Sequence, residues 1–126
     1  MNKLVASLLV CALLSTAASA NITVKEYRKF RDDKDNPANA QTWTEIERYL
    51  LGAGSAFQNV DVWMIGQKKA PYYCSPPTLS MNVGNLESII NARLERMTDP
   101  KYDEIELAQV LMYGLMETFP CQPPRK

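Results

Sequence analysis

Apolar side chains recur at spacings of three and four along most of this chain, and this periodicity constrains the fold more than any other feature. One series runs from Ile46 through Leu50 and Phe57 to Val60, and another from Ile105 to Phe119. Such spacing is typical of helices that bury one face. The sequence therefore predicts an all-α protein, a small helical domain of about four helices with one disulfide.

Capping and breaking residues set the expected helix boundaries. Thr23 and Glu26 have capping-box spacing, and so do Thr42 and Glu45. The remaining boundaries are expected at Pro37, Gly66, Asn82, Pro100 and Pro120. These signals place helices over about residues 24–31, 42–65, 83–97 and 105–119.

A patch of small residues, Gly52 to Ala56, lies inside the second expected helix. Each of the two glycines in this patch costs about 1 kcal/mol relative to alanine in a helix interior. We therefore predict that another element packs closely against this patch. A ligand site there is the weaker alternative.

The first twenty residues have the pattern of a signal peptide. Lys3 supplies positive charge, Leu4 to Leu14 form an apolar run, and Ala18-Ser19-Ala20 is a small-residue cleavage site. The apolar run is shorter than the roughly 20 residues that a permanent membrane anchor needs. We expect cleavage after Ala20, which leaves one helical domain over residues 21–126 in the periplasm. The alternative is an N-terminus that stays tethered to the membrane.

Cleavage would remove Cys11 and leave Cys74 and Cys121. Two cysteines in an oxidising compartment allow a single pairing, so we predict a structural disulfide between them. Closing a loop of about 47 residues would stabilise the fold by about 4 kcal/mol in the chain-entropy model. A redox-active pair is the weaker alternative, because the two cysteines do not form a Cys-x-x-Cys motif.

The chain contains no histidine, which excludes catalysis by Ser-His or Cys-His pairs and the usual histidine-led zinc site. Residue type alone leaves a carboxylate-only mechanism open. However, Glu45, Glu47, Asp61 and Glu87 fall at expected helix starts or exposed positions. We therefore expect no enzyme activity, no cofactor and no metal ion.

Charge argues against two further classes of partner. The chain has 14 basic and 14 acidic side chains, and this near-neutral, interspersed balance gives no footprint for nucleic acid or for a membrane surface. The acidic run before Pro37 lacks the glycine and distant glutamate of a calcium loop. We interpret those carboxylates as solvated.

The segment from Gln67 to Pro77 is the part of the chain with the most features of a partner-binding loop. It contains Lys68, Lys69, Tyr72 and Tyr73, and its three prolines and lack of periodicity rule out regular structure. Tyrosine offers large contact area at low entropic cost, so the segment is a candidate for recognition. The alternative is an ordinary connection whose tyrosines cover the core.

Short motifs follow one another in a familiar order from Tyr49 to Cys121. They are Tyr49-Leu50-Leu51-Gly52, Cys74-Ser75-Pro76, Leu86-Glu87-Ser88-Ile89-Ile90, Arg93-Leu94, Ala108-Gln109-Val110-Leu111, Gly114-Leu115 and Phe119-Pro120-Cys121. In order and spacing they resemble the Tai/Rap immunity proteins of bacterial type VI secretion systems, which are small, exported and helical.

The resemblance implies a function in protective binding. Such proteins sit in the periplasm and inhibit a peptidoglycan amidase effector delivered by a sibling cell, and several are homodimers. On this basis we expect the loop from Met64 to Tyr73 to enter the toxin's active-site cleft. The expected partner-binding residues are Trp63, Gln67, Lys68, Lys69, Tyr72 and Tyr73.

Two other function classes remain open from the sequence. One is a small periplasmic helical chaperone, which would expose apolar surface when its carboxylates are protonated at low pH. The other is an accessory subunit of an envelope complex.

Overall fold

The computed structural model describes residues 21–122, and within them the protein is all-α, as the periodicity predicts. Four α-helices follow one another: α2 (Val24–Asp32), α3 (Ala40–Gly66), α4 (Val83–Leu94) and α5 (Leu107–Thr118). The short 3-10 helices η2 (Pro37–Asn39) and η3 (Pro100–Tyr102) precede α3 and α5. The signal peptide predicted over residues 1–20 lies outside the described residues.

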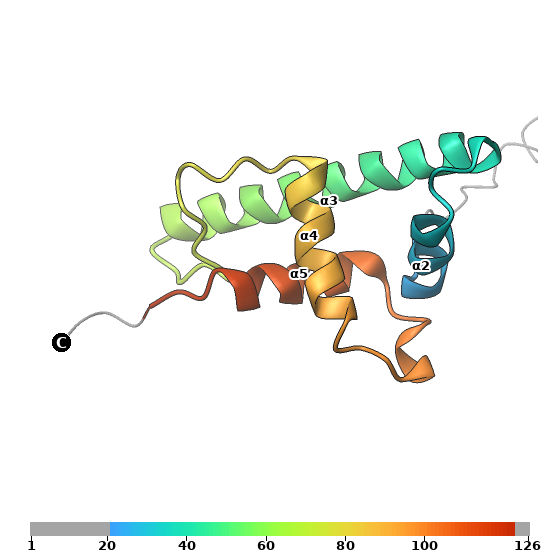
Figure 1. Cartoon of the computed structure of the whole chain (residues 1–126). Helices are drawn as coiled ribbons and strands as arrows, with labels where there is room; N and C mark the ends of the chain where they lie inside the picture. The colour runs from blue at the N-terminus through green and yellow to red at the C-terminus, as the bar shows by residue number, and fades with distance from the viewer. Residues whose placement is uncertain (1–20, 123–126) are drawn as a thin grey trace, which may run out of the picture.

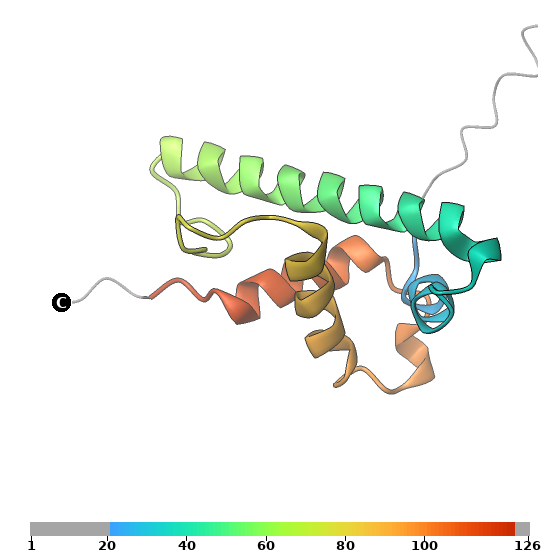
Figure 2. The same cartoon turned by 45° about the horizontal axis from the view of Figure 1, so that its top comes forward.

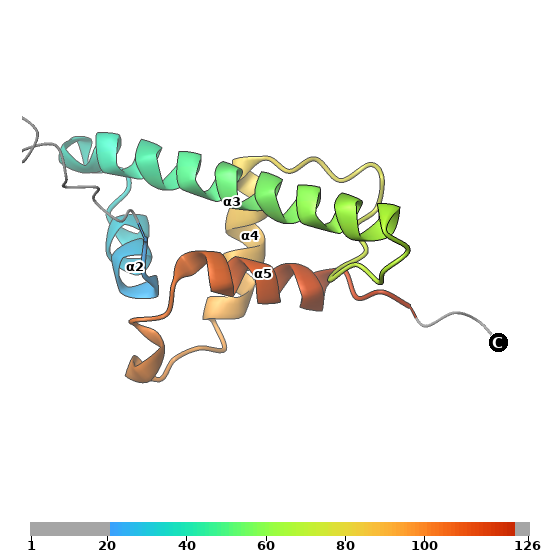
Figure 3. The ribbon, with the colours of Figure 1, turned by 180° about the vertical axis from the view of Figure 1, so that it is seen from behind.

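The helices form two layers around a common core. In Figure 1, α3 and α5 run side by side in roughly the same direction, and α4 crosses in front of both. Figure 2 shows the same arrangement after a turn of the molecule. From behind, α3 and α5 lie in front of α4 (Figure 3). The helix α2 packs on α3 and α5 at the end of the molecule where α3 begins.

The core takes apolar side chains from all four helices. Its fully buried members come from one face of each helix, which is the burial pattern that the periodicity predicts. They are Val24, Tyr27, Leu50, Leu86, Ile90, Leu107, Val110, Leu111 and Leu115.

Of the three helix starts predicted from capping residues, two are correct and one is wrong. Thr23 and Glu26 form the capping box of α2, and the Asn82 side chain accepts the Asn85 N–H at the start of α4. The second capping box is not formed, because η2 leads the chain into α3 at Ala40, two residues before Thr42. Proline at the first position of η2 starts this turn early.

The small-residue patch of α3 is a packing contact at one of its two glycines. A Cβ atom at Gly54 would lie 3.1 Å from both terminal methyl groups of Leu86, so α4 approaches α3 closely there. A Cβ atom at Gly52 would meet nothing within 4 Å. The prediction of close packing is therefore confirmed for Gly54 and wrong for Gly52.

Candidate partner-binding surface

The helix α3 is much longer than the helices that cover it. It has 27 residues, whereas α4 and α5 have 12 each, so at 1.5 Å per residue α3 is about 40 Å long and its neighbours about 18 Å. Its C-terminal turns therefore extend past much of the packed core (Figure 1). We call these turns, together with the loop that follows, the docking end (residues 60–73).

Large apolar side chains are exposed on the docking end. Val62 is 64 % exposed, Trp63 58 % and Ile65 60 %. Among residues 21–122, seven large hydrophobic residues are exposed, and five of them belong to this segment: Val60, Val62, Trp63, Ile65 and Tyr72. They lie on more than one side of the segment, because Val62 and Ile65 line a groove with Pro71, whereas Tyr72 lines another with Phe57. Exposed apolar side chains concentrated in one segment indicate a candidate interaction surface.

The docking end also has very little charge. Between Arg48 and Glu87 the chain carries only three charged residues, Asp61, Lys68 and Lys69. Asp61 is 6 % exposed, so the lysines are the exposed charges. Depletion of charge at the centre, with a few cations around it, is typical of the core and rim of a protein interface.

The turn after α3 holds Lys68 in an unusual backbone conformation. The Lys69 N–H donates to the Met64 carbonyl and the Lys68 N–H to the Ile65 carbonyl, both at 2.9 Å. This is the pairing of a Schellman motif, which requires a left-handed residue and usually has glycine there. Lys68 occupies that position with φ 57°, which costs a residue with a side chain about 1–2 kcal/mol.

The buried carboxylate of Asp61 fixes the far side of the loop. Its oxygens accept the N–H groups of Tyr72 at 3.0 Å and Tyr73 at 3.3 Å. Hydrogen bonds from backbone N–H groups to an ionised carboxylate are stronger than neutral ones. Asp61 therefore ties the loop to the inner face of α3 and leaves the outer face clear.

The predicted disulfide closes the segment that follows. Cys74 and Cys121 are bonded, with their Cα atoms 4.9 Å apart, and the Cys74 N–H donates to the Phe119 carbonyl at 2.8 Å. The loop is thus held by the Schellman turn, by Asp61 and by the end of α5. A pre-ordered loop loses less entropy when it binds.

Five of the six predicted binding residues are exposed within the docking end. Gln67, Lys68, Lys69 and Tyr72 are exposed, as is Trp63. The Lys69 ammonium lies 5.3 Å from the centre of the Trp63 ring, a cation–π contact that orders both side chains.

Tyr73 was expected at the interface, and the structure corrects this. Its side chain is 3 % exposed and belongs to the core cluster. Burial, and secondarily the Asp61 carboxylate, raise the pKa of Tyr73 to about 12. Tyr73 therefore fixes the loop to the core, and it is not part of the exposed surface of the docking end.

A shallow apolar groove adjoins the docking end. It has a volume of about 440 Å³ and lies between α3 and α5. Its lining residues are Phe57, Tyr72, Ala108, Gln109, Met112, Tyr113 and Met116. The sequence did not predict this groove or the exposure of Val62 and Ile65. The absence of charge between Arg48 and Glu87 was the signal that could have found the surface.

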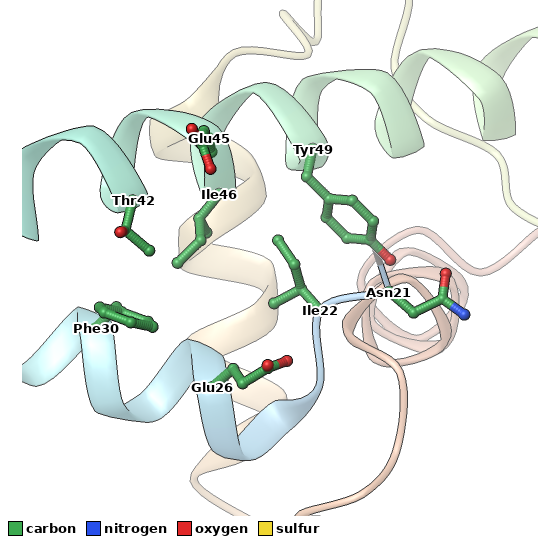
Figure 4. A pocket seen from close by; sticks show the side chains of 8 residues that line it. All are labelled: Asn21, Ile22, Glu26, Phe30, Thr42, Glu45, Ile46 and Tyr49. Atoms are coloured by element: carbon green, nitrogen blue, oxygen red, sulfur yellow. The ribbon is translucent and has the colours of Figure 1, made fainter. Parts of the chain in front are cut away.

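A second cleft, of about 270 Å³, lies at the opposite end of the molecule between α2 and α3 (Figure 4). Its carboxylates already have partners on their own helices. Glu26 accepts hydrogen bonds from Thr23, and Glu45 accepts one from Gln41. The apolar side chains of Phe30 and Ile46 line the cleft beside them.

Two further features bear on the class of protein. Within residues 21–122, no three His, Cys, Asp or Glu side chains are grouped so that they could hold a metal ion. None of the described helices has the length and hydropathy needed to cross a bilayer. Comparisons with protein-family models, with curated proteins and with solved structures found no match for this chain.

Proposed function

We propose that this protein is an exported immunity protein that binds and inhibits a peptidoglycan amidase toxin of a type VI secretion system. The observation that carries the proposal is the docking end, a pre-ordered, nearly uncharged segment with five large exposed apolar residues. The resemblance to the Tai/Rap proteins supplies the class of partner. The disulfide is consistent with an oxidising compartment such as the periplasm.

In this proposal, inhibition is steric. Trp63 and Tyr72 would enter the amidase cleft as aromatic anchors, because tryptophan and tyrosine dominate the energetics of most interfaces. Lys68 and Lys69 would face polar or acidic groups at the rim of the cleft and raise the association rate. The protein acts as a binding partner and performs no chemical step itself.

The test is inhibition of a type VI peptidoglycan amidase by the exported protein, residues 21–126; the enzyme to use is the one encoded beside this gene, if such a neighbour exists. We expect stoichiometric inhibition by the wild type. Trp63→Ala combined with Tyr72→Ala should weaken it by at least 10-fold, since two anchors cost about 1–2 kcal/mol or more each. Lys68→Ala with Lys69→Ala should slow association, and more so at low salt.

A matched control lies at the other end of the molecule. Lys25→Ala with Lys29→Ala removes the same charge from α2, where both lysines are exposed, and should leave inhibition unchanged. All variants should keep the wild-type helical circular dichroism. Full inhibition by the Trp63/Tyr72 variant would contradict the role of the docking end.

Absence of inhibition by the wild type at micromolar concentration would contradict the immunity function itself. The same surface would then be assigned to a chaperone or to an accessory subunit. Reversible binding of a hydrophobic dye at about pH 2–3 would favour the chaperone, because acid would then expose further apolar surface.

A further inference from the structure

The cleft between α2 and α3 contains the beginning of the described chain. Asn21 and Ile22 line it together with Glu26 of α2 and Glu45 and Tyr49 of α3 (Figure 4). In Figure 4 the Tyr49 hydroxyl group points toward Asn21. The cleft is therefore built partly from the segment that lies directly after the predicted cleavage site.

Backbone hydrogen bonds hold this segment in place. The Leu107 N–H donates to the Ile22 carbonyl at 2.8 Å, and the Val24 N–H donates to the Ile105 carbonyl at 2.9 Å. Thr23 and Glu106 form an isolated antiparallel bridge between them. The position of residue 21 is thus set by the turn that leads into α5.

Asn21 already contacts a carboxylate. Its side-chain nitrogen Nδ2 donates to Glu106 Oε1 at 2.8 Å. The α-nitrogen of an asparagine lies at most about 5 Å from its own Nδ2. The α-nitrogen of residue 21 is therefore within about 8 Å of the Glu106 carboxylate, which is no more than one Debye length at physiological salt.

We propose that the mouth of this cleft is a binding site for the protein's own mature amino terminus. Hydrolysis of the Ala20–Asn21 peptide bond adds water, leaves a carboxylate on Ala20 and frees the α-amine of Asn21, which is protonated at neutral pH. This α-ammonium pairs with the carboxylate of Glu106. The proposal rests on the export step of the proposed function and is independent of the amidase.

The charges around the cleft favour a cation there. Glu26, Glu45 and Glu106 take part in none of the five ion pairs found among residues 21–122. No lysine or arginine lines the cleft. The nearest basic residue along the chain is Lys25, which is exposed on the first turn of α2. The α-ammonium supplies a positive charge beside Glu106, which Asn21 already contacts and which has no ion-pair partner among the described residues.

Tyr49 is affected by the same carboxylate. Burial, and to a smaller extent the Glu106 charge, raise the pKa of the Tyr49 hydroxyl, while the Ala108 backbone lowers it. Tyr49 is therefore neutral at physiological pH and does not compete with Glu106 for the α-ammonium.

A paired amino terminus should titrate at higher pH than usual. An α-amine has an ordinary pKa of about 7.7–8.0, and nearby carboxylates should raise it by about one unit. A group whose pKa is raised in the folded state stabilises the fold below the unfolded pKa. That stability is lost as the pH rises through the folded pKa, here between about pH 7 and 10.

The experiment begins with the full-length precursor, which is exported, processed in the cell and purified from the periplasm. Mass spectrometry should give Asn21 as the first residue. A nuclear magnetic resonance titration should then place the α-amine pKa about one unit above its ordinary value. Glu106→Gln should reverse at least half of that shift, whereas Glu95→Gln, an exposed carboxylate at the end of α4, should not.

The thermal unfolding of the acetylated protein supplies a second readout. Acetylation of the α-amine should lower the unfolding temperature at pH 6–7, and the difference should disappear above about pH 10. A first residue other than Asn21 would overturn the proposal. So would an ordinary α-amine pKa, or a raised one that Glu106→Gln does not change. Because no step uses the amidase, these outcomes are separate from failure of the immunity function.

Discussion

Three of the five glycines lie in helix interiors, away from the first and last turns, and differ in what a methyl group would meet. A Cβ atom at Gly52 would have no neighbour within 4 Å, and one at Gly54 would lie 3.1 Å from the terminal methyl groups of Leu86. At Gly114 it would lie 2.6 Å from Ile89 Cγ2 and 3.4 Å from the Ile89 carbonyl oxygen. The same substitution, glycine to alanine, therefore tests three different contacts.

The expected free energies of unfolding follow from two opposing effects. Alanine in place of glycine stabilises a helix by about 0.5–1 kcal/mol, so Gly52→Ala should stabilise by that amount. Overpacking costs about 1–3 kcal/mol. At Gly54 the ends of Leu86 can rotate away, so the substitution should change the stability by less than about 0.5 kcal/mol.

Gly114→Ala should destabilise the protein, because Ile89 cannot move aside. Its Cγ2 is attached directly to Cβ, and β-branched side chains in helices have essentially one preferred χ1 rotamer. Overpacking minus the propensity gain gives a net loss of about 1–2 kcal/mol. A methyl group at Gly114 would force α4 to shift on α5. The contact between α4 and α5 is the most extensive one between two described helices.

The assay is urea unfolding followed by far-ultraviolet circular dichroism, with the disulfide intact. We expect the free energy of unfolding to be higher than wild type for Gly52→Ala, close to wild type for Gly54→Ala and lower for Gly114→Ala. If Gly114→Ala were as stable as Gly52→Ala, the close crossing of α4 and α5 would be refuted. A destabilised Gly52→Ala would refute the open surroundings of Gly52.

Three further predictions concern the loop and the surface. Asp61→Ala should destabilise the protein by about 2–4 kcal/mol, because two backbone N–H groups lose a charged acceptor. Urea unfolding measures this loss. A loss below about 0.5 kcal/mol would contradict the anchoring role of Asp61. Lys68→Gly should stabilise by about 0.5–1 kcal/mol by relieving the left-handed backbone, whereas Lys68→Ala should give no such gain. Arg93, and to a smaller extent Arg96, hold the pKa of the Glu117 carboxyl below its ordinary value. The contribution of Glu117 to the stability of the fold is therefore present above about pH 4.5 and is lost as the pH falls. Glu117→Gln should flatten the acid side of a plot of unfolding temperature against pH.

Much of the fold could be predicted because the relevant interactions are local. The capping box at Thr23 and the Asn82 cap join residues within one turn, so their spacing in the sequence already defines them. The disulfide could be predicted because only two cysteines remain after the expected cleavage. The start of α3 was missed because a 3-10 turn at Pro37 competes with the capping signal at Thr42.

The candidate surface was less predictable. Tyr72 and Tyr73 are neighbours in an irregular loop, where no periodicity says which side chain points inward. The choice is made by Asp61, which binds both backbone N–H groups from a helix 11 and 12 residues earlier in the chain. In the same way, Val60 belongs to the series predicted to be buried but is 41 % exposed, because α3 is more than twice as long as α4 and α5.

The sequence by itself therefore determined the helices, their approximate ends and the single disulfide pairing, because each depends on spacing along the chain. Only the tertiary structure decided that the last turns of α3 extend beyond their neighbours and that Tyr73, not Tyr72, is buried. It also brought Asn21 beside Glu106, 85 residues away. Such features depend on how the helices cross, and helix crossing follows from packing between distant residues.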